Sequence, residues 1–303
     1  MTSKPLAVNI PDWRRPLPLM ALVAGFGLVL YDWIGFVWKQ DLFSYGLLIP
    51  FVSAYLVHLR RSGDRHVQQT GEEKSSNVSG GRWLTIAACL FGLATLVVGW
   101  SLNPRSWPEA DRIALWMFAF VCLWIAGIGF CFGAETVARH RFALLFLFFM
   151  VPLPDGVVHA IEVFFQHTSA WAAAGFLELA STTMVHDGLR FELPGITLQV
   201  AEECSGIRSS LALFITSILA GHMFLKSRNK RILLALLVIP LGILRNGFRI
   251  FTIAQLCIHV GPEMVNSVIH RKGGPLFFGL SLIPFFLVLW WMRRLEGRAK
   301  APL

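Results

Sequence analysis

The chain has 303 residues and a net charge of +9, with 55% hydrophobic and 15% charged residues. Soluble domains carry roughly 25% charged residues, so this composition and a mean hydropathy of +0.60 exclude an ordinary soluble protein. The apolar residues run in unbroken blocks rather than alternating, which argues against a transmembrane β-barrel. We therefore predict an all-α, polytopic helical membrane protein. We expect no cleavable signal peptide, because the first apolar block is too long for one.

Eight apolar blocks are long enough to cross a bilayer, which takes roughly 20 helical residues. They lie at residues 17–38, 43–59, 83–102, 113–133, 142–158, 207–225, 232–257 and 275–292. This pattern predicts a bundle of about eight transmembrane helices, four of them within residues 1–140. Residues 141–292 hold the remaining spans, and residues 293–303 form a basic tail.

Residues 159–205 carry too many polar side chains for a span. The pattern of 159–180 is typical of an amphipathic helix on the membrane surface. Residues 188–200 alternate apolar and polar positions around Pro194-Gly195, which predicts a short hairpin or extended turn. We expect 159–205 to form a surface segment on the extracytoplasmic side.

The basic loops predict the orientation, because loops rich in Lys and Arg stay in the cytoplasm. Five segments alternate correctly across eight spans: the N-terminus, 60–82, 134–141, 226–231 and 293–303. They hold 18 of the 27 Lys and Arg residues but six of the 18 acidic ones. We thus expect both termini in the cytoplasm of a bacterial inner membrane, and a disordered loop at 60–82. The positive charge reflects topology and needs no nucleic-acid partner.

This topology brings three polar stretches to the outer face. They are Glu202–Arg208, Arg245–Ile250 and His270–Gly274. The first begins the sixth span, the second lies toward the outer end of the seventh, and the third precedes the eighth. Their convergence predicts a single extracytoplasmic site.

The residues of these stretches suit acyl-transfer chemistry. A thiol attacks as its thiolate, which a helix N-terminus favours, and Cys204 would lie at such an end with Ser205 able to cap it. Arg245 and Arg249 are four residues apart and share one helix face. A charged residue within a span is costly and is usually functional or paired. His270 could transfer the proton to a leaving amine.

Each of these residues also has a structural interpretation. Cysteines in apolar blocks are commonly inert, as we expect for Cys89, Cys122, Cys131 and Cys257. The two arginines could extend to the headgroups or pair with Glu202 and Glu203, and His270 could be a solvated loop residue. His159, Glu162 and His167 form a weak metal pattern; we expect no metal and no cofactor.

The three stretches resemble the exosortase/archaeosortase family of membrane transpeptidases. The family pattern is Cys-Ser-Gly, then Asn-x-x-Arg, then a later His followed by glycine. Here it reads Cys204-Ser205-Gly206, Asn246-Gly247-Phe248-Arg249, and His270 with Gly273-Gly274. The resemblance covers roughly residues 140 through 290 and makes 141–292 the catalytic core.

One position departs from the family pattern. Glu203 stands where the family often has a small residue, and a carboxylate beside Cys204 would weaken the nucleophile. Alternatively, Glu203 pairs with Arg208 or Arg245.

The resemblance implies cleavage of proteins that end in a sorting signal: a short motif such as Pro-Glu-Pro, a transmembrane helix and a basic end. Cys204 would attack the scissile carbonyl, Arg249 would stabilise the oxyanion, and His270 would move the proton. Arg245 and Asn246 would support them. The acyl group would pass to a surface glycan or lipid acceptor.

Three alternatives remain from the sequence. A transporter or channel could use Arg245, Arg249 and the helix end at Cys204 as an anion site. A structural subunit of an export or polysaccharide assembly complex would need no reactive thiol. A hydrolase with the same residues would cleave without transfer. The oligomeric state is left open.

Overall fold

The computed structural model describes residues 16–70, 78–102, 106–201, 205–266 and 273–298. The chain divides into two compact units, Met1–Asp155 and Gly156–Leu303. Among the described residues, six helices are long and apolar enough to cross a membrane, or up to eight if each of two bent helix pairs is one span. The prediction of a polytopic all-α membrane protein is confirmed.

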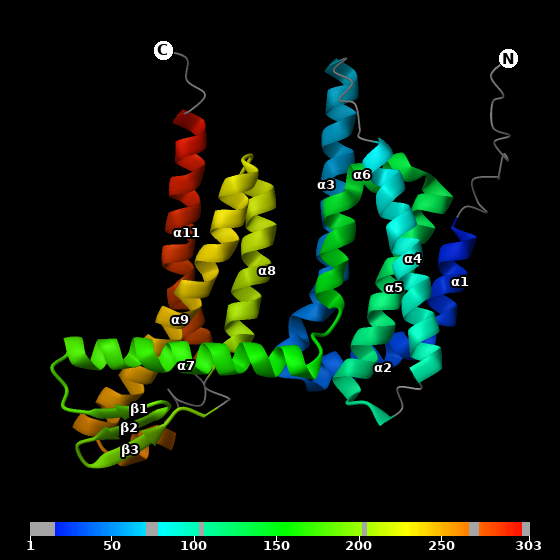
Figure 1. The fold of residues 1–303 in the computed structure, drawn as a ribbon. Coiled ribbons are helices and arrows are strands. Elements are labelled where there is room, and N and C mark those ends of the chain that lie inside the picture. The colour runs from blue at the N-terminus through cyan, green and yellow to red at the C-terminus, as the bar shows by residue number, and fades with distance from the viewer. Residues whose placement is uncertain (1–15, 71–77, 103–105, 202–204, 267–272, 299–303) are drawn as a thin grey trace, which may run out of the picture. The chain divides into compact units, whose positions relative to one another are not determined.

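The first unit is helical over almost all of its described residues (Figure 1). Its elements are α1 (Leu17–Gly25), α2 (Gly27–Lys39), η2 (Asp41–Leu48), α3 (Ile49–Thr70), α4 (Val78–Leu102), α5 (Glu109–Phe132), α6 (Ala134–Phe146) and η4 (Leu147–Met150). The first expected span is broken, since α1 and α2 meet at an angle of 61°. Gly25 and Gly27 flank this break, where glycine weakens the helix.

Small side chains let α4 approach its neighbours closely. Its buried face consists of Gly81, Thr85, Ala88, Gly92 and Gly99. A Cβ atom placed on Gly92 would lie 2.9 Å from the Leu123 side chain of α5. Membrane helices associate through such small-residue faces, because lipid supplies no hydrophobic force between them.

Two boundaries predicted from the sequence were wrong. The fifth span was expected at 142–158 after a turn at 134–141, but the helix already begins at Ala134 and η4 ends at Met150. Pro152 and Pro154 follow; proline cannot continue a helix and forces an extended preceding residue.

The loop expected at 60–82 is also shorter than predicted. α3 continues to Thr70 and α4 begins at Val78, while residues 71–77 lie outside the described part. Extending an existing helix avoids the cost of nucleation, so polar residues can continue it.

The second unit contains the three predicted motifs. Its elements are α7 (Asp155–Leu179, beginning one residue before the unit), β1 (Val185–Asp187), β2 (Arg190–Leu193), β3 (Ile196–Gln199), α8 (Ile207–Phe224), α9 (Arg228–His259), η6 (Pro262–Asn266) and α11 (Gly274–Arg298). α7 runs crosswise to α8 and α9 (Figure 1). The helix expected at 159–180 is therefore present, whereas its location on the membrane surface stays a prediction.

A buried apolar cluster joins α8, α9 and α11. It includes Leu213, Leu234, Val238, Phe285 and Leu289. At the end of this bundle, the Glu296 carboxylate of α11 accepts the backbone N–H groups of Lys226 and Ser227 at 2.8 and 2.9 Å. These bonds satisfy donors at the start of α9 that have no partner within the helix.

The hairpin predicted at 188–200 is part of a three-stranded antiparallel sheet with the order β1-β2-β3. Pro194-Gly195 forms the two-residue turn between Leu193 and Ile196, and Gly195 has a φ of +83° that glycine adopts readily. β1 was not expected from the sequence; it pairs with β2, with Val185 opposite Glu192 and Asp187 opposite Arg190. Three-residue strands give too short a pattern to recognise.

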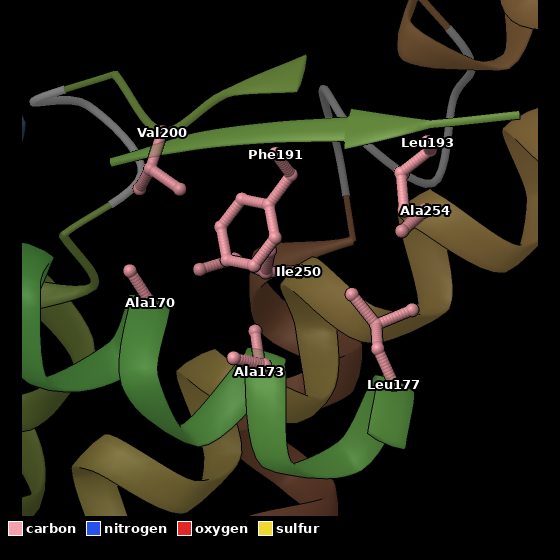
Figure 2. Packing of buried hydrophobic residues seen from close by; sticks show 9 residues of the cluster. Ala170, Ala173, Leu177, Phe191, Leu193, Val200, Ile250 and Ala254 are labelled. Carbon is pink, nitrogen blue, oxygen red and sulfur yellow. The ribbon is translucent and has the colours of Figure 1, made fainter. Parts of the chain in front are cut away.

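The sheet packs against α7 and α9 through one apolar face. Figure 2 shows Phe191, Leu193 and Val200 pointing from the sheet toward the two helices. They meet the following buried residues: Ala170, Ala173 and Leu177 of α7 and Ile250 and Ala254 of α9. This layer fixes the strand that leads into the Cys204 segment relative to the helix that carries Arg249.

Candidate active site

The start of α8 is built on Gly206, two residues after Cys204. Gly206 is the N-cap residue, with a left-handed backbone at φ +74° and ψ +14°. Its carbonyl oxygen accepts Ser210 N–H at 3.1 Å and the Ser209 hydroxyl at 3.1 Å. Ser205 was expected to cap this helix. It instead precedes the cap, is 2% exposed, and its Oγ accepts Ile207 N–H only at a long 3.5 Å.

Arg245 of α9 fastens this helix start. Its Nη2 donates to the carbonyl oxygen of Gly206 at 3.0 Å and to Oγ of Ser210 at 3.1 Å. The Arg245 side chain is 8% exposed, so it does not extend to the headgroups as one alternative required. Hydrogen bonds from a charged group are stronger than neutral ones. Arg245 therefore holds the Gly206 end of the Cys204 segment against α9.

Asn246 packs beside the same glycine. It is 2% exposed, and a Cβ atom placed on Gly206 would lie 3.0 Å from its Oδ1 and 3.1 Å from Nη2 of Arg245. A side chain at position 206 would thus be strained by its backbone and crowded by both residues. The glycine of Cys-Ser-Gly and the asparagine of Asn-x-x-Arg belong to one packed arrangement.

Upstream of Cys204, the chain is held by α7. The buried side chain of Gln166 donates from Nε2 to the carbonyl oxygen of Val200 at 2.7 Å, and Val200 N–H donates to Leu189 O at 2.9 Å. Val200 is itself part of the apolar layer beneath the sheet. The Cys204 segment is therefore bounded by two fixed points, Val200 and Gly206.

α7 and α9 cross in close contact at Gly247. A Cβ atom there would lie 2.6 Å from Cβ of Ala172 and 3.1 Å from both Ala173 N and Ser169 O. This crossing places α7 against the turn of α9 that contains Asn246 and Arg249.

The length of α9 shows where Arg245 and Arg249 lie along the membrane-spanning part of this helix. α9 has 32 residues, and crossing the hydrocarbon core takes roughly 20. Counting from Arg228, that length is reached near Gly247. Arg245 and Arg249 therefore lie at the end of the span remote from the basic turn at 226–231, where polar side chains are less costly.

The structure places some predicted site residues and not others. Ser205, Gly206, Arg245 and Asn246 are brought together, and Arg249 follows one turn later, partly buried. Arg208 is exposed on the first turn of α8. Predicted positions outside the described residues are Glu202, Glu203, Cys204 and His270. Their roles stay predictions.

Three supporting contacts were not expected from the sequence. Ser210 accepts a hydrogen bond from Arg245, and Gln166 donates one to Val200. Gly247 lets α7 and α9 cross in close contact. Small residues facing each other are the usual signal of close membrane helices, so Gly247 and the Ala172–Ala174 run could have indicated the crossing. A single Ser or Gln gives no comparable pattern.

The described residues contain no group of three or more His, Cys, Asp or Glu side chains that could hold a metal ion. The sequence motifs offer no cofactor-binding pattern either.

The family model for transmembrane exosortases matches residues 37–287, well over half of the 303 residues. The chain belongs to this family. No curated protein and no solved structure matches the chain. The resemblance seen in the sequence is thus confirmed, and it was drawn too narrowly: the exosortase match begins far before residue 140 and includes most of the first unit.

For this exosortase, the Arg245 contacts allow a direct test of the site's architecture. Arg245→Ala should lower the free energy of unfolding by roughly 2 kcal/mol, because it removes hydrogen bonds from a charged donor to two partly or fully buried acceptors. Thermal unfolding in detergent measures the change. Arg228→Ala, at an exposed arginine that begins the same helix, is the matched control and should change stability by less than about 0.5 kcal/mol. Equal effects of the two substitutions would contradict a stabilising role for the hydrogen bonds of Arg245 to Gly206 and Ser210.

Proposed function

We propose that this exosortase is a membrane-embedded cysteine transpeptidase that cleaves C-terminal sorting signals at the extracytoplasmic face and transfers the protein to a surface acceptor. Family membership supports the reaction class. The observation that carries the assignment to these residues is the contact of Arg245 Nη2 with Gly206 O at 3.0 Å. It joins the Cys-Ser-Gly motif to the helix of the Asn-x-x-Arg motif.

The proposed chemistry proceeds in two steps. The Cys204 thiolate attacks the scissile carbonyl carbon, and the resulting oxyanion is stabilised by Arg249. The C–N bond breaks, His270 gives its proton to the leaving amine, and a thioester to Cys204 remains. The acceptor then attacks the thioester, His270 takes the acceptor's proton, and the thiolate is released.

The contacts around Gly206 support this scheme by limiting the freedom of the nucleophile's segment. With Val200 and Gly206 both fixed, the two ends of the stretch that contains Cys204 are held in place. Preorganisation of this kind lowers the entropy cost of reaching the transition state. Arg245 acts here as a positioning residue, while Arg249 is the candidate for contact with the substrate.

The charge distribution supports the proposed sidedness. The basic turn at 226–231 favours the cytoplasm, and Arg245 and Arg249 lie at the other end of α9. The substrate is a protein whose sorting signal ends in a transmembrane helix and a basic cluster. Its helix would enter from the bilayer, its basic end would stay in the cytoplasm, and its cleavage motif would reach the outer face. A glycan or lipid amine or hydroxyl would be the acceptor.

Thiol labelling from outside tests this proposal. Spheroplasts that express the protein and a reporter ending in a Pro-Glu-Pro motif, one apolar helix and a basic cluster are treated with a membrane-impermeant maleimide. We expect reporter cleavage to stop, and peptide mass spectrometry to locate the label on Cys204. Continued cleavage with Cys204 fully labelled would reject the nucleophile. Complete protection of Cys204 outside, but labelling after permeabilisation, would reject the orientation.

A further inference from the structure

β3 is an edge strand of the sheet in the second unit. Strand order is β1-β2-β3, and within the described residues β3 (Ile196–Gln199) pairs with β2 alone. An edge strand presents a row of N–H and C=O groups able to pair with another extended chain.

The register shows which backbone groups face this edge. Val200 N–H, just after β3, donates to Leu189 O, just before β2, and antiparallel strands alternate between residues that face the partner and residues that face away. Leu198 and Ile196 therefore face β2. Thr197 and Gln199 direct their N–H and C=O groups to the free edge, offering two donors and two acceptors.

The side chains of the edge leave it accessible. Thr197 and Gln199 are exposed, whereas Ile196 and Leu198 are partly buried against the layer of α7 and α9. The outer face also carries the exposed ion pair of Arg190 with Glu192 at 3.0 Å. An extended peptide at this edge would meet polar groups on the side that faces away from the helices.

The edge leads directly to the proposed nucleophile. Gln199 precedes Cys204 by five residues, a stretch that spans at most about 18 Å when fully extended. The intervening Val200 is fixed by Gln166, so the chain that leaves the edge toward Cys204 is held to α7 at this point. The opposite edge is less suitable, since β1 has three residues and lies two strands away.

From these observations we infer that the β3 edge binds the substrate as an added strand. Resting on the proposed function, this inference names the occupant as the extended polar segment of the substrate that precedes its transmembrane helix. Two residues of that segment, two positions apart, pair with Thr197 and Gln199 through their backbones. Proline is compatible with the position between them, because its missing N–H would face away from β3.

Proline substitutions test the edge without breaking the β2–β3 pairing. Thr197→Pro and Gln199→Pro each remove an N–H that faces the free edge, a place where proline is tolerated in sheets. His186→Pro removes the corresponding outward N–H from β1 and is the matched control. The reporter described above is expressed with each variant, and its initial cleavage rate is normalised to protein level.

We expect Thr197→Pro and Gln199→Pro each to lower the cleavage rate at least about five-fold, as the loss of one intermolecular hydrogen bond would. His186→Pro should retain the wild-type rate within about two-fold, although it also removes the ring that stacks on Phe191. Wild-type rates in the two β3 variants, or equal losses in all three, would overturn the edge as the substrate site. If Cys204→Ala abolishes cleavage in the same assay, the proposed function survives that failure; a wild-type protein that does not cleave the reporter would overturn both.

Photo-crosslinking provides a second measurement if a proline variant does not accumulate. A photoreactive phenylalanine derivative replaces Thr197 in the Cys204→Ala background, in which substrate can bind without turnover. We expect a crosslink to the segment just before the reporter's apolar helix. Crosslinks confined to the reporter's folded domain, or none at all, would overturn the inference.

Discussion

Cys204→Ala should abolish cleavage of the sorting-signal reporter, lowering its rate by at least about 1,000-fold, because the reaction loses its nucleophile. The protein should still accumulate in the membrane, since one small side chain is replaced by another. The reporter's mobility on a gel, followed over time after induction, measures the effect. Residual cleavage at more than a few per cent of the wild-type rate would assign the chemistry to another residue.

The other cysteines supply the control for this experiment. Cys122 and Cys257 are buried, and Cys89 and Cys131 are partly buried, all within helices of the bundle. A variant with all four replaced by alanine should cleave the reporter at nearly the wild-type rate. Loss of cleavage in that variant at normal protein level would contradict the assignment of Cys204 as the one reactive thiol.

Hydropathy predicted the membrane helices well because a span must be apolar over its whole length. The helices α8, α9 and α11 lie where the sequence placed the last three spans. The expectation failed at 142–158, where an apolar run continues through Pro152 and Pro154. Proline is compatible with apolar composition but not with a continuous helix, so composition alone overestimated the span.

The contacts of the candidate site could not be predicted from the sequence, and the catalytic roles of its residue types stay predictions. Cys204, Arg249 and His270 were proposed because each carries a reactive or charged group at the predicted end of a span. The bond of Arg245 to Gly206 joins residues 39 positions apart, and no local pattern encodes such a pairing. The sequence also allowed Arg245 to pair with an acidic residue, an alternative that differs only in which way the side chain turns.

The supporting residues show why small side chains matter in this site. Gly206 and Gly247 stand within the two motifs but have no side chain that suggests a role, and each lies where two segments approach within about 3 Å of an added Cβ atom. In a membrane bundle such contacts replace the hydrophobic force that drives packing in water. The geometry of the candidate site thus depends on residues whose small size allows close packing.

Gly247→Ala should therefore destabilise the protein, in spite of alanine's better helix propensity. The added methyl would lie 2.6 Å from Cβ of Ala172 and 3.1 Å from the backbone of Ser169 and Ala173. Backbone atoms cannot turn away, so α7 and α9 must separate. Overpacking of this kind costs about 1–3 kcal/mol, and the midpoint of thermal unfolding in detergent should fall by several degrees.

Gly175→Ala is the matched control for this prediction. Gly175 lies on α7, the partner helix in the crossing, and a Cβ atom there meets nothing within 4 Å. Alanine should stabilise this position by roughly 0.5–1 kcal/mol, because glycine loses more backbone freedom than alanine does when the chain folds into a helix. Opposite signs at two helical glycines would show that the contact at Gly247 holds α9, and with it Asn246 and Arg249, in place. A stabilising Gly247→Ala would show instead that the two helices are free to move apart and that their crossing does not set the geometry of the site.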